Sequence, residues 1–237
     1  MIVRSYASSS LLITQPDHAA LAGRIMDVWA TRGLRDAPRR ASILRAVSEH
    51  DVGWREVDSA PLVDEANGQV LDFISAPASV RQGVWPRAVQ RLSNDPTTAA
   101  LVAEHAIQVY SRYRGDVQWT GFFDTMASLR DEHAARARLS KDAVREMYFF
   151  VRAGDLISLT FCTGWLEPQT IDDHEIKLVG PNDVGIQPDP FGGAVVPFEI
   201  SARALPNRPF PSPAEAAELF RQAPVITLRG TVRGLGA

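Results

Sequence analysis

Residues 38–51 read PRRASILRAVSEHD, and this stretch predicts an amphipathic helix that ends in a histidine and an aspartate. The apolar side chains of one face recur at spacings of three and four residues: Ile43, Leu44 and Val47. His50 and Asp51 continue that face, where burial is costly unless hydrogen bonds or a metal ion satisfy the polar groups. Gly53 follows at the position of a left-handed helix cap.

The same periodicity predicts further helices on both sides of this stretch. We expect them at about residues 16–31, 96–113, 120–138 and 141–162, with a shorter helix at 83–93. Residues 54–80 are rich in acids and turn formers and predict a long ordered loop, a kind of segment that is often functional. Polar side chains again fall on inward faces of three helices, at His18, His105 and Asp155.

From Gly164 onward the helical pattern fades and short strand-type runs appear. They read EIKLV at 175–179, GGAVVPFEISARAL at 192–205 and VITLRGTVRGL at 225–235. A short helix is expected at 213–222, and residues 1–14 predict a short strand or extended arm. The predicted fold is therefore mainly α, with a helical bundle at 1–163 and a small β-rich C-terminal extension at 164–237. The two parts are expected to share a core, which makes the chain α+β overall.

Composition narrows the classes of function. The chain has 237 residues, 45% of them hydrophobic, and a formal net charge of −3, which suits one sizeable globular domain. No basic run favours nucleic-acid binding, no apolar run is long enough to span a bilayer, and the first residues lack a signal peptide's apolar stretch. We expect a cytoplasmic protein that acts on a small molecule. Cys162, the single cysteine, excludes an intrachain disulfide and a CxxC zinc site.

Four ligand-type residues on three inward helical faces predict a metal site: His18, His50, Asp51 and Asp155. Imidazole and carboxylate ligands without a thiolate are compatible with a divalent Mn, Fe, Co, Ni, Zn or Mg ion, and the sequence does not choose among these. The alternative is that each is a hydrogen-bonded core residue, with Asp155 capping a kink at Gly154. Four such residues together favour the metal site.

Three further residues are candidates for the chemistry. His105 lies on the inward stripe of its helix and is expected to orient a substrate, act in catalysis or bind a second metal. Trp54 is expected to stack on a substrate or fill the core. Asp58 is a candidate general base, a partner of a ligating histidine, or a turn residue.

The order His, His-Asp, Asp across these helices resembles the HD superfamily of metal-dependent phosphohydrolases, over about residues 14–163. Three stretches are similar to a family of uncharacterised bacterial HD-like proteins: QPDHAALAGRIMDVW at 15–29, AVSEHDVGWREVDSAPL at 46–62 and AGDLISLTFC at 153–162. The resemblance implies a compact helical bundle and metal ligation by His18, His50, Asp51 and Asp155. It also implies hydrolysis of a phosphoester or phosphoanhydride, often in a nucleotide.

One departure from the superfamily affects the choice of function. Many catalytic members carry a basic residue shortly after the His-Asp pair, whereas this chain has Val52-Gly53-Trp54. Basic residues in nearby segments are candidates to replace it: Arg24, Arg45 and Arg55. Two functions stay open at this point. One is a hydrolase that uses a metal-activated water, and the other is a non-catalytic metal- or ligand-binding protein. The substrate and the oligomeric state are not predicted.

Overall fold

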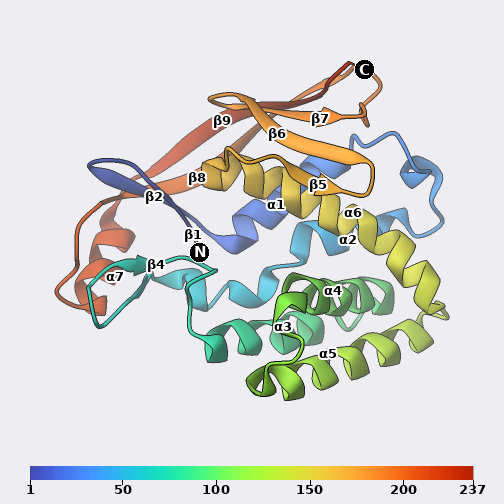
Figure 1. Ribbon diagram of the computed structural model, residues 1–237, viewed down its shortest axis with the longest axis horizontal. Coiled ribbons are helices and arrows are strands. Elements are labelled where there is room, and N and C mark those ends of the chain that lie inside the picture. Colours follow the sequence, from blue (N-terminus) through green and yellow to red (C-terminus); the bar gives the residue numbers. More distant parts are fainter. Residues whose placement is uncertain (237) are drawn as a thin grey trace.

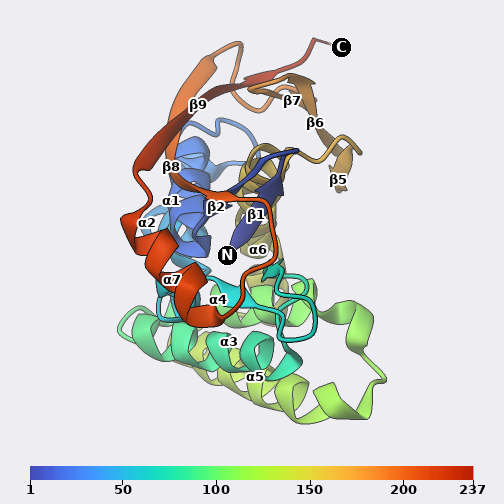
Figure 2. The ribbon, with the colours of Figure 1, turned by 90° about the vertical axis from the view of Figure 1, so that its left-hand side faces the viewer.

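A curled β-sheet covers two layers of helices in the computed structural model, which describes residues 1–236 (Figure 1). The chain is 50% helical and 21% strand, so both types of element build the fold. The sheet packs on α1 and α6, and α3, α4 and α5 lie on the far side of those helices (Figures 1 and 2).

The helices begin and end close to the positions that the periodicity predicts. Their bounds are α1 Gln15–Met26, α2 Arg40–Glu49, α3 Ala78–Leu92, α4 Pro96–Val109, α5 Val117–Arg136, α6 Lys141–Leu159 and α7 Pro213–Gln222. Side-chain caps fix several starts: the hydroxyls of Thr14 and Ser140 accept from the backbone of α1 and α6, and Asp95 caps α4. A π-helical turn at Thr160–Gly164 continues α6. The helix start predicted at residue 83 lies at Ala78 instead.

The main sheet has seven strands in the order β1-β2-β8-β9-β7-β6-β5. The strand bounds are β1 Ile2–Ser5, β2 Ser9–Ile13, β5 Gln169–Ile171, β6 His174–Gly180, β7 Asp183–Gln187, β8 Val195–Pro206 and β9 Val225–Gly234. All neighbouring pairs are antiparallel except β7 and β9, which run parallel. A separate two-stranded hairpin, β3 Leu62–Val63 and β4 Val70–Leu71, lies within the predicted 54–80 loop.

The predicted fold class, a mainly helical bundle with a small C-terminal extension, is wrong. The seven-stranded sheet takes strands from both ends of the chain, because β2 pairs with β8 through partners such as Leu12 and Arg203. β8 is twelve residues long, pairs with β2 on one side and β9 on the other, and alternates between buried and exposed side chains, so it is an interior strand with one face on the core. Long-range pairing of this kind leaves no periodic signal in the sequence. The division of the chain at residue 163 stays a prediction.

The expected shared core is confirmed. One continuous cluster of buried side chains contains residues of the helices together with residues of β6 to β9, including Ile176, Ile186 and Val232. Phe161, in the π-helical turn, meets Phe198 of β8 edge-to-face at 4.7 Å between ring centroids. Helices and sheet therefore stabilise one another. In the part of the chain that the structure describes, no helix has the length and apolarity needed to cross a membrane.

Gly53 is required for close packing and not for a left-handed cap, which corrects the expectation from the sequence. Its φ angle is not positive, and a Cβ atom at this position would lie 1.9 Å from the carbonyl oxygen of Val84 on α3. Only a glycine lets the segment after His50 pack directly on the α3 backbone.

Gly53→Ala should therefore destabilise the protein by about 3 kcal/mol or more, because a backbone atom must move to accept the methyl group. The matched control is Gly121→Ala on α5, where a Cβ meets nothing within 4 Å. That change should raise stability by about 0.5–1 kcal/mol. Urea unfolding of both variants measures the difference, and equal stability of the two would contradict this account of Gly53.

Candidate metal centre

Five buried histidines and aspartates from four helical segments meet near the middle of the molecule. His18 lies on α1, His105 on α4 and Asp155 on α6, while His50 and Asp51 follow the last residue of α2. Their ligand atoms form two overlapping groups that could each hold a metal ion. One group is His18, His50 and Asp51, and the other is His50, His105 and Asp155; within each, the ligand atoms lie within 4.8 Å of one another.

The end of α2 lets two consecutive residues turn toward one point. His50 still has helical angles, with φ −55° and ψ −34°, but Asp51 leaves the helix at φ −99° and ψ 16°. The third helix comes close because α6 carries Gly154 next to Asp155. A Cβ at Gly154 would lie 2.6 Å from Val47 Cγ1 and 2.9 Å from Met26 Cγ, so α6 packs tightly against α1 and α2.

The inner ligand atoms are two imidazole nitrogens and two carboxylate oxygens. His18 Nε2 lies 3.2 Å from His50 Nε2 and 2.9 Å from Asp51 Oδ2. Asp155 Oδ1 lies 3.6 Å from His50 Nε2 and 3.8 Å from His18 Nε2. The atoms of His18, His50 and Asp51 form one of the two groups, and Asp155 belongs to the second group, which shares His50. Imidazole nitrogens and carboxylate oxygens are ligands that divalent cations accept.

The outer nitrogens of the two histidines fix which ring nitrogen faces inward. His50 Nδ1 donates to the Val47 carbonyl oxygen at 2.7 Å, and a carbonyl can only accept. His18 Nδ1 lies 2.7 Å from Ser158 Oγ, whose own proton goes to the Asp155 carbonyl, so the serine accepts from the imidazole. Both neutral rings therefore present an Nε2 lone pair to the same point. Two lone pairs 3.2 Å apart require a proton or a metal ion between them.

The charges at the site favour a cation at that point. Burial opposes a charged imidazole, but the carboxylates of Asp51 and Asp155 outweigh it and raise the pKa of His50 to about 10. Burial also opposes ionised carboxylates, yet the histidines keep the pKa values of Asp51 and Asp155 well below the usual range. In the metal-free protein a proton on His50 thus occupies the place of a metal ion.

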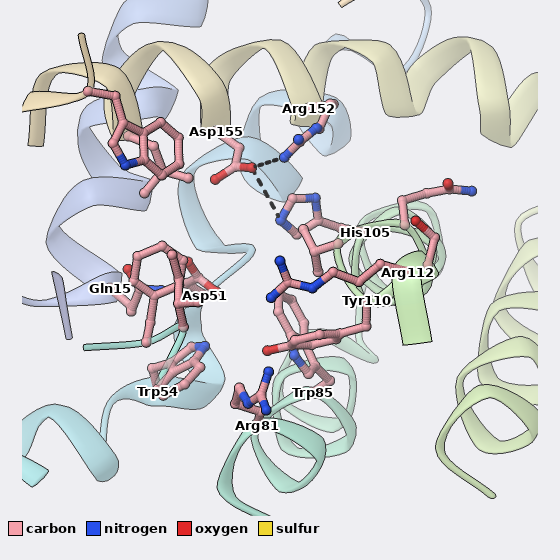
Figure 3. Close-up of a pocket in the computed structure, with 17 residues that line it drawn as sticks. Gln15, Asp51, Trp54, Arg81, Trp85, His105, Tyr110, Arg112, Arg152 and Asp155 are labelled. Atoms are coloured by element: carbon pink, nitrogen blue, oxygen red, sulfur yellow. Dashed lines mark hydrogen bonds and ion pairs between the residues drawn. The ribbon is translucent and has the colours of Figure 1, made fainter. Parts of the chain in front are cut away.

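His105 extends the cluster toward a cavity. Its Nε2 lies 3.9 Å from Asp155 Oδ2, and its Nδ1 lies 3.3 Å from the Tyr148 hydroxyl. Burial lowers the pKa of His105 to about 3, so the ring is neutral near pH 7. Arg152 donates to Asp155 Oδ2 at 2.7 Å (Figure 3). The other oxygen, Oδ1, faces His18 and His50.

A cavity of about 330 Å³ opens beside this cluster (Figure 3). Asp51, His105 and Asp155 line it, whereas His18 and His50 lie behind them. Aromatic and basic side chains form much of the remaining wall: Trp54, Trp85, Tyr110, Trp165, Arg81, Arg112 and Arg152. A ligand in the cavity can therefore reach Asp51, His105 and Asp155.

The structure brings together His18, His50, Asp51, Asp155 and His105, and it places Trp54 on the cavity wall. Asp58 lies elsewhere. Its buried carboxylate accepts from the Met1 amino group at 2.7 Å and from the Gln15 backbone N–H at 2.6 Å. A direct catalytic contact for Asp58 has no support in this geometry; the residue anchors the start of α1, where Gln15 borders the cavity.

Other residues of the site were not among the candidates predicted from the sequence. The candidates Arg24, Arg45 and Arg55 do not line the cavity, and its arginines are Arg81, Arg112 and Arg152. Arg152 had a signal, since it precedes Asp155 by three residues on one helix and therefore shares its face. Nothing in the sequence indicated that Arg81 and Arg112 belong to the site, because α3 and the turn after α4 meet only in the folded chain.

Ser158 is expected to fix the tautomer of His18. In Ser158→Ala the Nδ1–H of His18 loses its acceptor, and the ring can move its proton to Nε2, where it blocks metal binding. We expect metal affinity to fall about 10- to 100-fold with the fold retained. Competition with a chelating dye measures the affinity. Ser59→Ala, at an exposed serine, is the control, and equal affinity in the two variants would contradict this role.

The chain is thus an α+β protein, and its buried imidazoles and carboxylates beside a cavity form a candidate metal-binding site. Residues 1–207 match the family described as protein of unknown function DUF3891, and the chain belongs to that family. The matched part contains all five residues of the cluster and the strands from β1 to β8. No curated protein and no solved structure matches the chain.

Proposed function

We propose that this protein is a metal-dependent hydrolase of a small phosphoester or phosphoanhydride, of which a nucleotide is one candidate. The observation that supports it most is the pair of inward Nε2 atoms of His18 and His50, 3.2 Å apart between two carboxylates and next to a cavity. The proposal takes from the HD superfamily the order of the ligands and the reaction class, and not the all-helical bundle.

His18, His50, Asp51 and Asp155 would hold the ion. Two nitrogen and two oxygen ligands suit divalent Mn, Fe, Co, Ni, Zn or Mg, with neutral imidazoles and ionised carboxylates as the binding forms. When bound, such an ion polarises a phosphoryl group. It also lowers the pKa of a water molecule, which makes that water a better nucleophile toward phosphorus. Asp51 and Asp155 lie on the cavity wall, so the open side of the site faces the substrate.

The charge of the cavity wall favours an anionic substrate. Three arginines line it against two aspartates, and a divalent ion would add further positive charge. Arg152 supplies the basic group that is missing after His50-Asp51. One of its nitrogens is bound to Asp155 Oδ2, and the other guanidinium N–H groups stay available to phosphoryl oxygens.

His105 is the residue best placed to act on the substrate itself. It lines the cavity, lies next to Asp155, and is neutral near pH 7 because burial lowers its pKa to about 3. A neutral imidazole can donate one hydrogen bond to a phosphoryl oxygen or, with the other tautomer, bind a second metal ion. The Tyr148 hydroxyl at Nδ1 can match either tautomer, since it both donates and accepts.

Metal analysis followed by a hydrolysis screen tests the proposal. We expect the purified protein to bind a divalent ion and, once loaded, to release phosphate from at least one nucleotide or generic phosphoester. Asp51→Asn, which keeps the shape of the side chain and removes its charge, is the matched inactive variant. A loaded wild-type protein that hydrolyses none of these compounds would favour the non-catalytic metal- or ligand-binding protein instead.

A further inference from the structure

Two arginines on the outer part of the cavity wall have no carboxylate partner. Arg81 comes from α3 and Arg112 from the turn that follows α4, and both line the cavity (Figure 3). Among the described residues, neither forms an ion pair, in contrast to Arg152, which is paired with Asp155. Their positive charge is therefore not used to balance an acidic side chain of the protein.

A shared acceptor brings the two guanidinium groups together. The Tyr113 hydroxyl oxygen accepts from Arg81 at 3.0 Å and from Arg112 at 3.1 Å. Arg81 also lies over the rings of Tyr113 and Trp119, each at 5.3 Å from its carbon to the ring centroid, which restricts its movement. Two like charges that share one acceptor repel each other, and an anion bound to both would remove that repulsion.

Buried hydrogen-bonding groups on this wall also lack partners. Arg81 Nε and Trp54 Nε1 are inaccessible to solvent and donate to no acceptor in the described residues. Trp54 itself is only 1% exposed. Buried donors are almost always paired in folded proteins, so these two mark a wall that is short of acceptors.

We propose that Arg81 and Arg112 form an outer oxyanion subsite that binds a second, non-reacting anionic group of the substrate. This inference rests on the proposed hydrolase function, in which the bond to be cleaved lies at Asp155 and His105. The substrate class is then a small molecule with two anionic groups, a scissile phosphoester at the inner end of the cavity and a second oxyanion at the outer end. Planar guanidinium groups suit such oxygens because they donate two parallel hydrogen bonds.

Binding of inorganic phosphate to chelator-treated protein at low salt tests the subsite directly. Isothermal titration should show one phosphate bound per chain, and Arg112→Met and Arg81→Met should each weaken it at least about tenfold. Arg114→Met is the matched control, since Arg114 is exposed, lies over Phe123 and is not on the cavity wall. His50→Gln, which disturbs the metal ligands and leaves both arginines in place, should weaken phosphate binding far less than either arginine variant.

The outcomes separate this inference from the proposed function. Absence of phosphate binding in the wild type, or equal binding in Arg112→Met and wild type, would overturn the subsite. Loss of phosphate binding in His50→Gln alone would place the anion at the metal ligands, which leaves the hydrolase proposal intact and also overturns the subsite. Arginine-dependent phosphate binding in a protein that takes up no metal would support the subsite and remove the hydrolase. Arg112 is exposed, so its variant decides the matter if Arg81→Met does not fold.

Discussion

His50→Ala is expected to leave the protein without its metal ion. His50 Nε2 belongs to both groups of ligand atoms, so its loss removes a donor from each. Alanine also removes the positive charge that the metal-free protein places between Asp51 and Asp155, and unpaired buried carboxylates are destabilising by several kcal/mol. Elemental analysis should show a fall from about one equivalent to near zero, and the variant should unfold at a lower temperature than the wild type.

A second substitution separates metal loss from misfolding. His50→Gln preserves much of the volume and a polar group, and it should fold while binding metal far more weakly. His133→Ala on α5 is the control, because His133 contacts Arg136 and lies outside the ligand groups. A folded His50 variant that keeps full metal content would show that the ligand assignment is wrong.

The candidate ligands could be predicted from the sequence because each lies on, or directly after, a helix with a clear apolar face. The spacing of Val47 and His50 on one helix, and of Val151 and Asp155 on another, is a local property that survives without knowledge of the fold. Close packing of those faces then brings the polar groups together. Gly154 contributes to this packing, although its role in helix contact could not be recognised without the positions of Val47 and Met26.

The sheet and the substrate end of the cavity depend on contacts between distant segments. Leu12 pairs with Arg203, and Arg81 meets Arg112 through Tyr113, yet no spacing in the sequence relates these residues. The short strands β1 and β2 look like an extended arm because β8, which joins β2 to the rest of the sheet, comes almost two hundred residues later. Asp58 shows that a position close to the ligands in the sequence does not fix the role of a residue either. Its place just after His50-Asp51 leaves a general base, a partner of a ligating histidine and a turn residue all open, and only the fold shows that it contacts Gln15 and Met1.

His105→Gln is expected to lower turnover by about 100-fold or more, while the fold and the metal at His18 and His50 are kept. The imidazole lies at the border between the ligand cluster and the cavity, with Nε2 3.9 Å from Asp155 Oδ2. There it can donate to the phosphoryl oxygens as negative charge develops on them. Glutamine has a similar size and can fill the space, but it cannot place a ring N–H at that point or bind a metal in the same way.

Steady-state kinetics on the substrate found in the hydrolysis screen, together with metal counting, measure this effect. A loss in kcat with one metal ion still bound would assign His105 to the substrate, whereas loss of a second ion together with turnover would assign it to a second metal site. His133→Gln should leave both quantities unchanged. Turnover equal to that of the wild type in folded His105→Gln would remove His105 from the mechanism, because a residue 3.9 Å from Asp155 that acts on the reacting group cannot be replaced without loss.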